Sequence, residues 1–162
     1  MEVDTIVSLS TSPGVSAVAL VRLSGPGSTT VLHQLLAAGE SMPVVRVPTL
    51  CGLIEPATGE ALDSALVTYF KGPASYTGED LIEISTHGGF LIPQLVMEAS
   101  VQAGARPAEA GEFTKRAYLH GKLDLVQAEA VADLIGARSR GFHRVALGQL
   151  ERGLSARVSG LR

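Results

Sequence analysis

Three polar side chains that could do chemistry alternate along the short stretch of residues 80–87. Successive side chains of a β-strand point to opposite faces, so one face of this stretch presents Glu83, Ser85 and His87 together. The opposite face, with Ile82, Ile84 and Thr86, is predicted to pack into a core. Gly88 and Gly89 then end the strand and allow a close backbone approach, which places the polar row at a junction between a strand and a helix.

Glu83 has two interpretations. A glutamate on the open face of a strand is commonly only solvated, whereas a carboxylate can also accept two hydrogen bonds from a planar pair of N–H donors. No second histidine, cysteine or carboxylate lies at metal-ligand spacing from His87, so a metal site is not predicted. We expect His87 to be a structural residue whose side chain faces the ligand, if one binds. The sequence contains no Ser/His/Asp or Cys/His arrangement and no G-x-x-x-x-G-K-[ST] phosphate loop.

Two basic residues could accompany Glu83. Arg22 stands at the end of the apolar run 16–23, where an arginine needs either a partner or access to solvent. Lys122 follows Gly121 just before a predicted helix and has the context of an ordinary surface lysine. A charge pair between Glu83 and one of these two cations is the structural alternative to a ligand site.

The composition favours one compact domain with an appendage. The 162 residues are 46% hydrophobic and 18% charged, which is typical of a globular protein. The net charge of −3 excludes a basic nucleic-acid footprint over the whole chain, so any RNA contact must be local. The single cysteine, Cys51, lies in an apolar run and is predicted to be buried. Without a secretory segment or an apolar run of ~20 residues, we expect a soluble cytoplasmic protein.

The elements that must position these residues are read from hydrophobic periodicity. Alternating or almost continuously apolar runs predict five strands, and helical spacing predicts a helix after the second strand and another after the fifth. The order implies an α+β fold in which a mixed sheet of about five strands carries helices on one face. The predicted strands span residues 4–10, 16–23, 44–54, 62–70 and 80–87.

The last third of the chain is predicted to be helical. A short helix over 113–120 precedes Asp124, whose spacing to Gln127 is typical of a capping box at the start of a longer helix. The later leucines recur every three or four residues as far as Leu161, so we expect a truncated helical domain over 121–162 after a first domain over 1–120. Arginines crowd this segment, and they either form a solvated face or contact the phosphates of an RNA.

Three ordered blocks of the chain resemble one family. Block one runs from Asp-Thr-Ile-Val at residues 4–7 to Val-Arg-Leu-Ser-Gly at 21–25, and block two holds Thr-Gly-Glu-Asp at 77–80 and His-Gly-Gly at 87–89. Block three starts with Gly-Glu-Phe-Thr-Lys-Arg-Ala at 111–117 and ends in the run from Gly121 to Ala130. Together they resemble the N-terminal domain of the MnmE/TrmE tRNA-modification GTPases.

The resemblance implies a function for the three candidate residues. It makes Arg22, Glu83 and Lys122 a binding site for a tetrahydrofolate derivative, either 5-formyl- or 5,10-methylene-tetrahydrofolate. It implies half of the folate-binding fold of the aminomethyltransferases, and so a homodimer that rebuilds the duplicated fold. The full-length protein would work with a flavin-dependent partner protein on the wobble uridine of tRNA, with the folate as one-carbon donor. GTP hydrolysis would belong to that protein and not to this chain.

Two alternatives stay open at this point. The domain could be a dimerisation scaffold that binds no ligand, or a stand-alone folate-dependent one-carbon transferase. The transferase is disfavoured because the sequence shows no base or nucleophile for it.

Overall fold

The computed structural model describes residues 4–159, with side chains as far as residue 151, and divides the chain into two compact units. The first unit contains Met1–Ser75 and Glu79–Glu109, and the second contains Tyr76–Gly78 and Ala110–Arg162. The loop before the fifth strand therefore gives three residues to the second unit. The predicted domain boundary after residue 120 stays a prediction.

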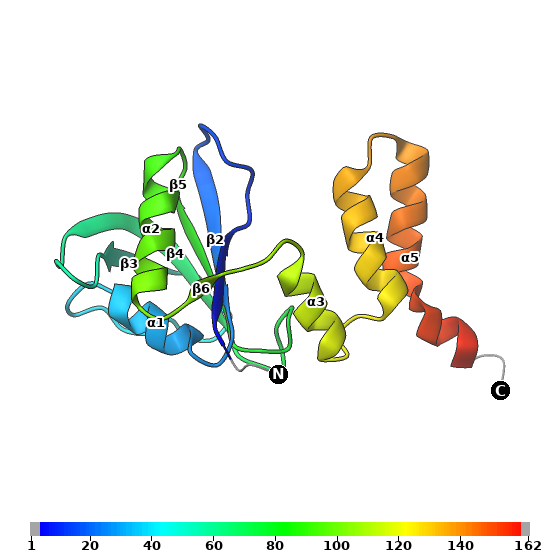
Figure 1. Ribbon diagram of the computed structural model, residues 1–162, viewed down its shortest axis with the longest axis horizontal. Helices are drawn as coiled ribbons and strands as arrows, with labels where there is room; N and C mark the ends of the chain where they lie inside the picture. Colours follow the sequence, from blue (N-terminus) through cyan, green and yellow to red (C-terminus); the bar gives the residue numbers. More distant parts are fainter. Residues whose placement is uncertain (1–3, 160–162) are drawn as a thin grey trace. The chain divides into compact units, whose positions relative to one another are not determined.

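The first unit is built on a six-stranded sheet with the order β3-β4-β5-β2-β1-β6 (Figure 1). All neighbours are antiparallel except β1 and β6, which pair in parallel, so the predicted mixed sheet is confirmed. The strands are β1 (Ile6–Leu9), β2 (Val18–Ser24), β3 (Thr49–Ile54), β4 (Ala61–Phe70), β5 (Leu81–His87) and β6 (Arg106–Pro107).

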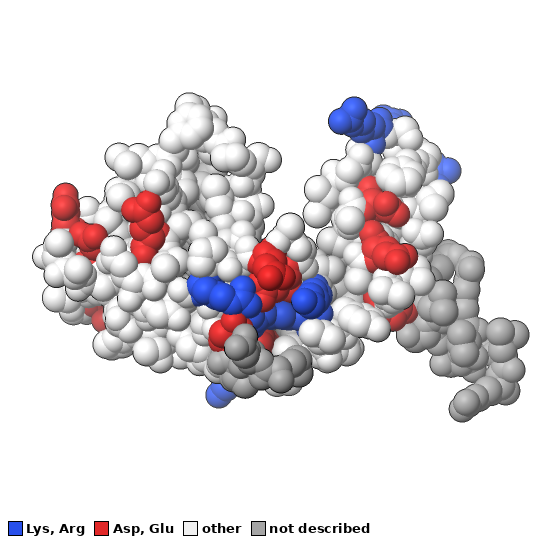
Figure 2. Space-filling model, in the orientation of Figure 1, with Lys and Arg blue, Asp and Glu red and all other residues white. Residues whose placement is uncertain are grey.

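Two helices, α1 (Ser28–Leu35) and α2 (Leu91–Gln102), pack together on one face of this sheet, as predicted (Figure 1). We name this the covered face and the opposite one the open face. The covered face and the helices share one core of aliphatic side chains, among them the fully buried Val21, Ile82 and Ile84. Figure 2 shows that most of the surface on this side of the unit is uncharged, with charged side chains in separate patches.

Three features of the sheet differ from the sequence prediction. The sixth strand, β6, has only two residues, which is too short for any periodic pattern to reveal. The strand predicted from Val44 begins at Thr49, because residues 44–47 form a turn closed by the Val47 N–H and the Val44 carbonyl. Arg22 lies inside β2 and not at its end, and Ser8 and Glu83 lie beside it on the two neighbouring strands.

The second unit contains α3 (Glu112–Leu119), α4 (Leu125–Gly136) and α5 (Arg140–Ser159). The predicted capping box is confirmed: the Asp124 carboxylate accepts from the Gln127 N–H, and the Gln127 side chain accepts from the Asp124 N–H, both at 2.9 Å. Helices α4 and α5 pack as a hairpin. Leu161 and Arg162, cited above for the helical pattern and the chain end, lie outside the described residues. Within the part described, no helix combines the length and apolar character of a membrane span.

Candidate functional site

The structure brings Arg22 and Glu83 together at the centre of the open face. They are directly opposite each other on the antiparallel strands β2 and β5. The Arg22 Nε–H donates to Glu83 Oε1 at 3.0 Å, and a second guanidinium nitrogen donates to the same oxygen. About a quarter of each side chain is exposed, 25% for Arg22 and 27% for Glu83. The pair is therefore an ion pair that a ligand can reach.

Glu83 keeps acceptor capacity for a ligand. Both bonds from Arg22 end on Oε1, and among the described residues Oε2 accepts no hydrogen bond. An ionised carboxylate offers about four lone-pair sites, two on each oxygen, so the two on Oε2 remain to accept from ligand N–H donors such as the ring N–H and exocyclic amine at the edge of a pterin.

Two hydroxyl side chains extend the ion pair into a row across four strands. Ser8 lies opposite Arg22 on β1, and Thr68 lies opposite Glu83 on β4. All four side chains are on the open face and half-buried, since directly paired residues in a sheet share a face. We call Ser8, Arg22, Glu83 and Thr68 the polar row.

Lys122 belongs to the second unit, so the structure pairs two of the three predicted site residues and places the third in the other unit. Its backbone N–H donates to the Ala117 carbonyl at 2.8 Å, which closes the C-terminal end of α3, and its side chain is exposed. Gly121 just before it has a φ of 67°, a conformation that favours glycine. The assignment of Lys122 to the ligand site stays a prediction.

His87 has a carboxylate partner that the sequence did not reveal. Its Nδ1 lies 2.7 Å from Asp63 Oδ1, and its backbone N–H donates to Asp63 Oδ2 at 2.8 Å. The Asp63 side chain is 6% exposed and the His87 side chain 69%. Asp63 therefore fixes the end of β5 and the orientation of the imidazole, which fits the structural role that we expected. The described residues include no group of three His, Cys, Asp or Glu arranged to hold a metal.

Gly88, directly after His87, serves the fold. A Cβ on Gly88 would lie 2.1 Å from the carbonyl oxygen of Ser16, so no larger residue fits without a backbone shift. The close approach that we expected at this point is thus to the chain itself. Ligand contact at Gly89 stays open.

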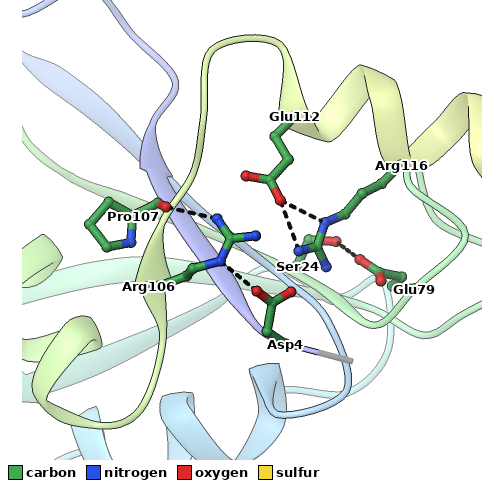
Figure 3. Close-up of polar contacts among 7 residues, drawn as sticks. All are labelled: Asp4, Ser24, Glu79, Arg106, Pro107, Glu112 and Arg116. Carbon is green, nitrogen blue, oxygen red and sulfur yellow. Dashed lines mark hydrogen bonds and ion pairs between the residues drawn. The ribbon is translucent and has the colours of Figure 1, made fainter. Parts of the chain in front are cut away.

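The Thr-Gly-Glu-Asp motif anchors the loop that leads into β5. The Ser24 hydroxyl donates to Glu79 Oε2 at 2.8 Å, one of the polar contacts in Figure 3. Asp80 accepts from the Gly72 N–H through Oδ1 at 2.9 Å, and its carbonyl accepts from the Gly25 N–H at 3.0 Å. Burial raises the pKa of Tyr69, and a hydrogen bond to the Asp80 carboxylate raises it further. These bonds fix the start of the strand that carries Glu83.

Some other charged groups in the described chain also form ion pairs. Figure 3 shows Arg106 bonded to the Asp4 carboxylate and the Pro107 carbonyl in the first unit, and Arg116 bonded to Glu112 along α3 in the second. The last two side chains are 11% and 8% exposed, so this pair is more buried than Arg22 and Glu83. Burial alone therefore does not single out a ligand site among the ion pairs.

Cys51 is buried at 1% exposure, as predicted for a small apolar side chain. Burial raises the pKa of its thiol, and the charge of Glu40 raises it further. A thiol held in its neutral form is a poor nucleophile. Cys51 is thus a core residue of the covered face.

The chain matches known proteins over most of its length. Residues 5–122 match the family described as "GTP-binding protein TrmE N-terminus". The "tRNA modification GTPase MnmE" of Akkermansia muciniphila is 47% identical over 160 residues, which cover 98% of this chain and 35% of that protein. The protein of the same name from Caulobacter vibrioides is 49% identical over 154 residues, 95% of this chain and 33% of its own. The chain thus spans about a third of the length of these relatives.

Proposed function

The chain belongs to the TrmE N-terminus family, and from this premise we propose that it binds a tetrahydrofolate derivative and dimerises within a tRNA modification GTPase. The observation that carries the proposal is the pairing of Arg22 with Glu83 on the open face. This arrangement holds a carboxylate at the middle of the sheet with one oxygen left to accept from a ligand.

The roles of the residues follow from their chemistry. Glu83 accepts from the donor edge of the pterin ring, and the guanidinium of Arg22 keeps the carboxylate in place through its two bonds. The assignment of Lys122 to the same ligand rests on the family resemblance alone. When bound, the folate supplies the one-carbon unit, while this chain binds and orients it. No general base or nucleophile is assigned to the chain.

Dimerisation is proposed through the sheet of the first unit. The open face carries exposed apolar side chains, with Val18 at 58%, Leu50 at 66% and Leu66 at 44% exposure. Exposed apolar side chains grouped on one face are typical of a surface that another protein covers. A second copy of this chain suits it, because two copies would rebuild the duplicated folate-binding fold to which the family is similar.

The larger function belongs to the full-length protein and is part of the same proposal. That protein would modify C5 of the wobble uridine in tRNA in the cytoplasm, together with a flavin-dependent partner protein. GTP hydrolysis would lie outside these residues, whose sequence has no phosphate-binding loop. The arginines near the start of α5, such as Arg138, Arg140 and Arg144, remain candidates for a local tRNA contact.

Calorimetric titration of 5-formyltetrahydrofolate into the chain and its Glu83→Gln variant tests the site. Glutamine keeps the shape but turns one acceptor into a donor opposite a donor edge, so affinity should fall roughly tenfold to several-hundredfold. Glu60→Gln, at an exposed position in the turn before β4, is the matched control and should bind like the parent chain. Equal binding by Glu83→Gln and the parent would reduce Glu83 to a solvated strand residue.

A ligand-free dimerisation scaffold is the second candidate. Glu83 already has an ion-pair partner without any ligand, which is what a decayed site would also retain. Absence of binding by the parent chain, together with a persistent dimer, would favour this candidate. Strong destabilisation of the ligand-free Glu83→Gln variant would support it as well.

A further inference from the structure

Arg46 occupies a backbone conformation that arginine rarely adopts. Its φ of 63° lies in the left-handed region, at the third position of the turn that residues 44–47 form. Glycine or asparagine is favoured at such a position because a Cβ is strained there. The Arg46 N–H donates to the Tyr69 carbonyl at 2.7 Å, which fixes this turn against the end of β4. The strained position thus carries a long cationic side chain.

The guanidinium of Arg46 lies beside an aromatic ring. Its Cζ is 5.9 Å from the centre of the Phe70 ring, within the range of a cation–π contact. One nitrogen donates to the Ala74 carbonyl at 2.5 Å, which uses one of five N–H donors. No carboxylate among the described residues pairs with this guanidinium. The guanidinium of Arg46 is thus exposed and positioned by two contacts, and it has no carboxylate partner in the part of the chain described.

Phe70 places this cation on the same face as the polar row. Thr68 lies directly opposite Glu83, and Phe70 lies two residues further along β4, so both point to the open face. Phe70 is therefore a diagonal neighbour of Glu83 across the two strands. From Glu83 outward, the open face offers a carboxylate, a hydroxyl, an aromatic ring and a guanidinium.

The order of these groups matches the order of groups in a folate. A reduced folate has a pterin with N–H donors at one end, an aminobenzoyl ring in the middle and glutamate carboxylates at the other end. We infer that Arg46 binds the glutamate end and gives the site a preference for ligands that carry glutamate. The inference rests on the proposed folate site at Glu83. It adds an anion-binding position to the site, and this would explain why an arginine stands at a strained backbone position.

Two ligands that differ only in the glutamate test this role. Calorimetry with 5-formyltetrahydrofolate and with 5-formyltetrahydropteroate, which lacks glutamate, should show tighter binding of the folate by the parent chain. Because Arg46 is exposed, its loss in Arg46→Gln should weaken folate binding only about three- to tenfold. Pteroate affinity should stay within about twofold, since neither the pterin nor the ring would lose its partner.

Further variants separate charge from backbone effects. Arg46→Gly removes the cation and relieves the strained φ, which offsets the lost bond to Ala74, so it should still fold and should lose the same preference for folate. Arg46→Lys should restore part of it, and higher salt should reduce the preference in the parent chain. Arg140→Gln, a matched exposed arginine at the start of α5, should leave both affinities unchanged.

The outcomes distinguish this inference from the proposed function. Parent binding of both ligands with equal affinity, or an equal loss for both ligands in Arg46→Gln, would overturn the role of Arg46 and leave the folate site standing. In the second case Arg46 would act only by holding the loop at Ala74. Failure of the parent chain to bind either ligand would remove the proposed function itself.

Discussion

The two faces of the sheet differ in how far their side chains are buried within the first unit. On the covered face, Val21, Ile82 and Ile84 are 0% exposed and are packed by α1 and α2. On the open face, Glu83 is 27% and Leu66 is 44% exposed. Strand residues therefore alternate between a side whose contacts are made within the unit and a side with contacts left to make. Stability is concentrated on the first side, and recognition is expected on the second.

The largest expected effect is on the covered face. Ile84→Ala should lower the free energy of unfolding by about 2–5 kcal/mol, because it leaves a cavity beneath the helices. Its neighbour Ser85→Ala, on the open face, should change that free energy by less than about 0.5 kcal/mol. Urea unfolding followed by circular dichroism measures both. Similar losses in the two variants would contradict the division of roles between the faces.

The proposed dimer would form through the open face. Leu66→Glu places a charge among the exposed apolar side chains and should raise the dimer dissociation constant at least about tenfold, which is about 1.4 kcal/mol. Analytical ultracentrifugation over a range of concentrations measures it. Ile135→Glu on α4, where the isoleucine is 83% exposed, is the control for self-association through the helices and should leave the dimer intact. A monomeric parent chain at every concentration would eliminate the dimer proposal.

The thiol on the covered face predicts a pH dependence. The pKa of Cys51 is raised in the folded chain, so above about pH 8.5 the unfolded chain loses a proton that the folded chain keeps. The folded state is therefore destabilised as pH rises through the range in which the thiol of the unfolded chain ionises. Comparison with Cys51→Ala isolates the effect, because Tyr69 titrates in both proteins. Parallel stability curves for the two proteins would show that burial does not shift this thiol.

The smallest expected effect comes from the same substitution, Thr→Val, made once on each face of the sheet. Thr68→Val removes a hydroxyl from the polar row and should weaken 5-formyltetrahydrofolate binding about two- to fivefold, with little change in stability. Thr86→Val should do the reverse. Thr86 is 2% exposed and its hydroxyl donates to the His87 carbonyl at 3.0 Å, so its loss should lower stability by roughly 1 kcal/mol and leave affinity unchanged. Calorimetry measures the affinity and urea unfolding the stability of both variants. A loss of both properties in either variant would contradict the assignment of binding to the open face and stability to the covered face.

Local patterns were sufficient to predict several elements. The alternation over residues 80–87 gave the bounds of β5 within one residue and the correct side for Glu83. The spacing of Asp124 and Gln127 predicted a cap whose two hydrogen bonds lie within four residues. Both features depend only on neighbours in the chain, which is why a sequence pattern reveals them.

The remaining features depend on residues far apart in the chain. The contact of His87 with Asp63 joins two residues 24 positions apart in the chain, which no local pattern records. The apolar residues around Arg46 have the composition of a strand, yet the flanking Pro43 and Pro48 and the turn interrupt it. The open-face location of Glu83 was predictable, whereas its bond to Arg22 required the register of β2 and β5.

The Arg22–Glu83 pair also has a consequence for the order of events during synthesis. The two residues are 61 positions apart in the chain. The pairing of β2 with β5 at the centre of the sheet can form only after β5 has been synthesised. Contacts between distant residues slow folding, because a long loop must close first. A nascent chain that has released β1 to β4 from the ribosome therefore still lacks the carboxylate. A ligand of the proposed site can therefore bind through Glu83 only after β5 has been synthesised, and it cannot guide the pairing of the earlier strands.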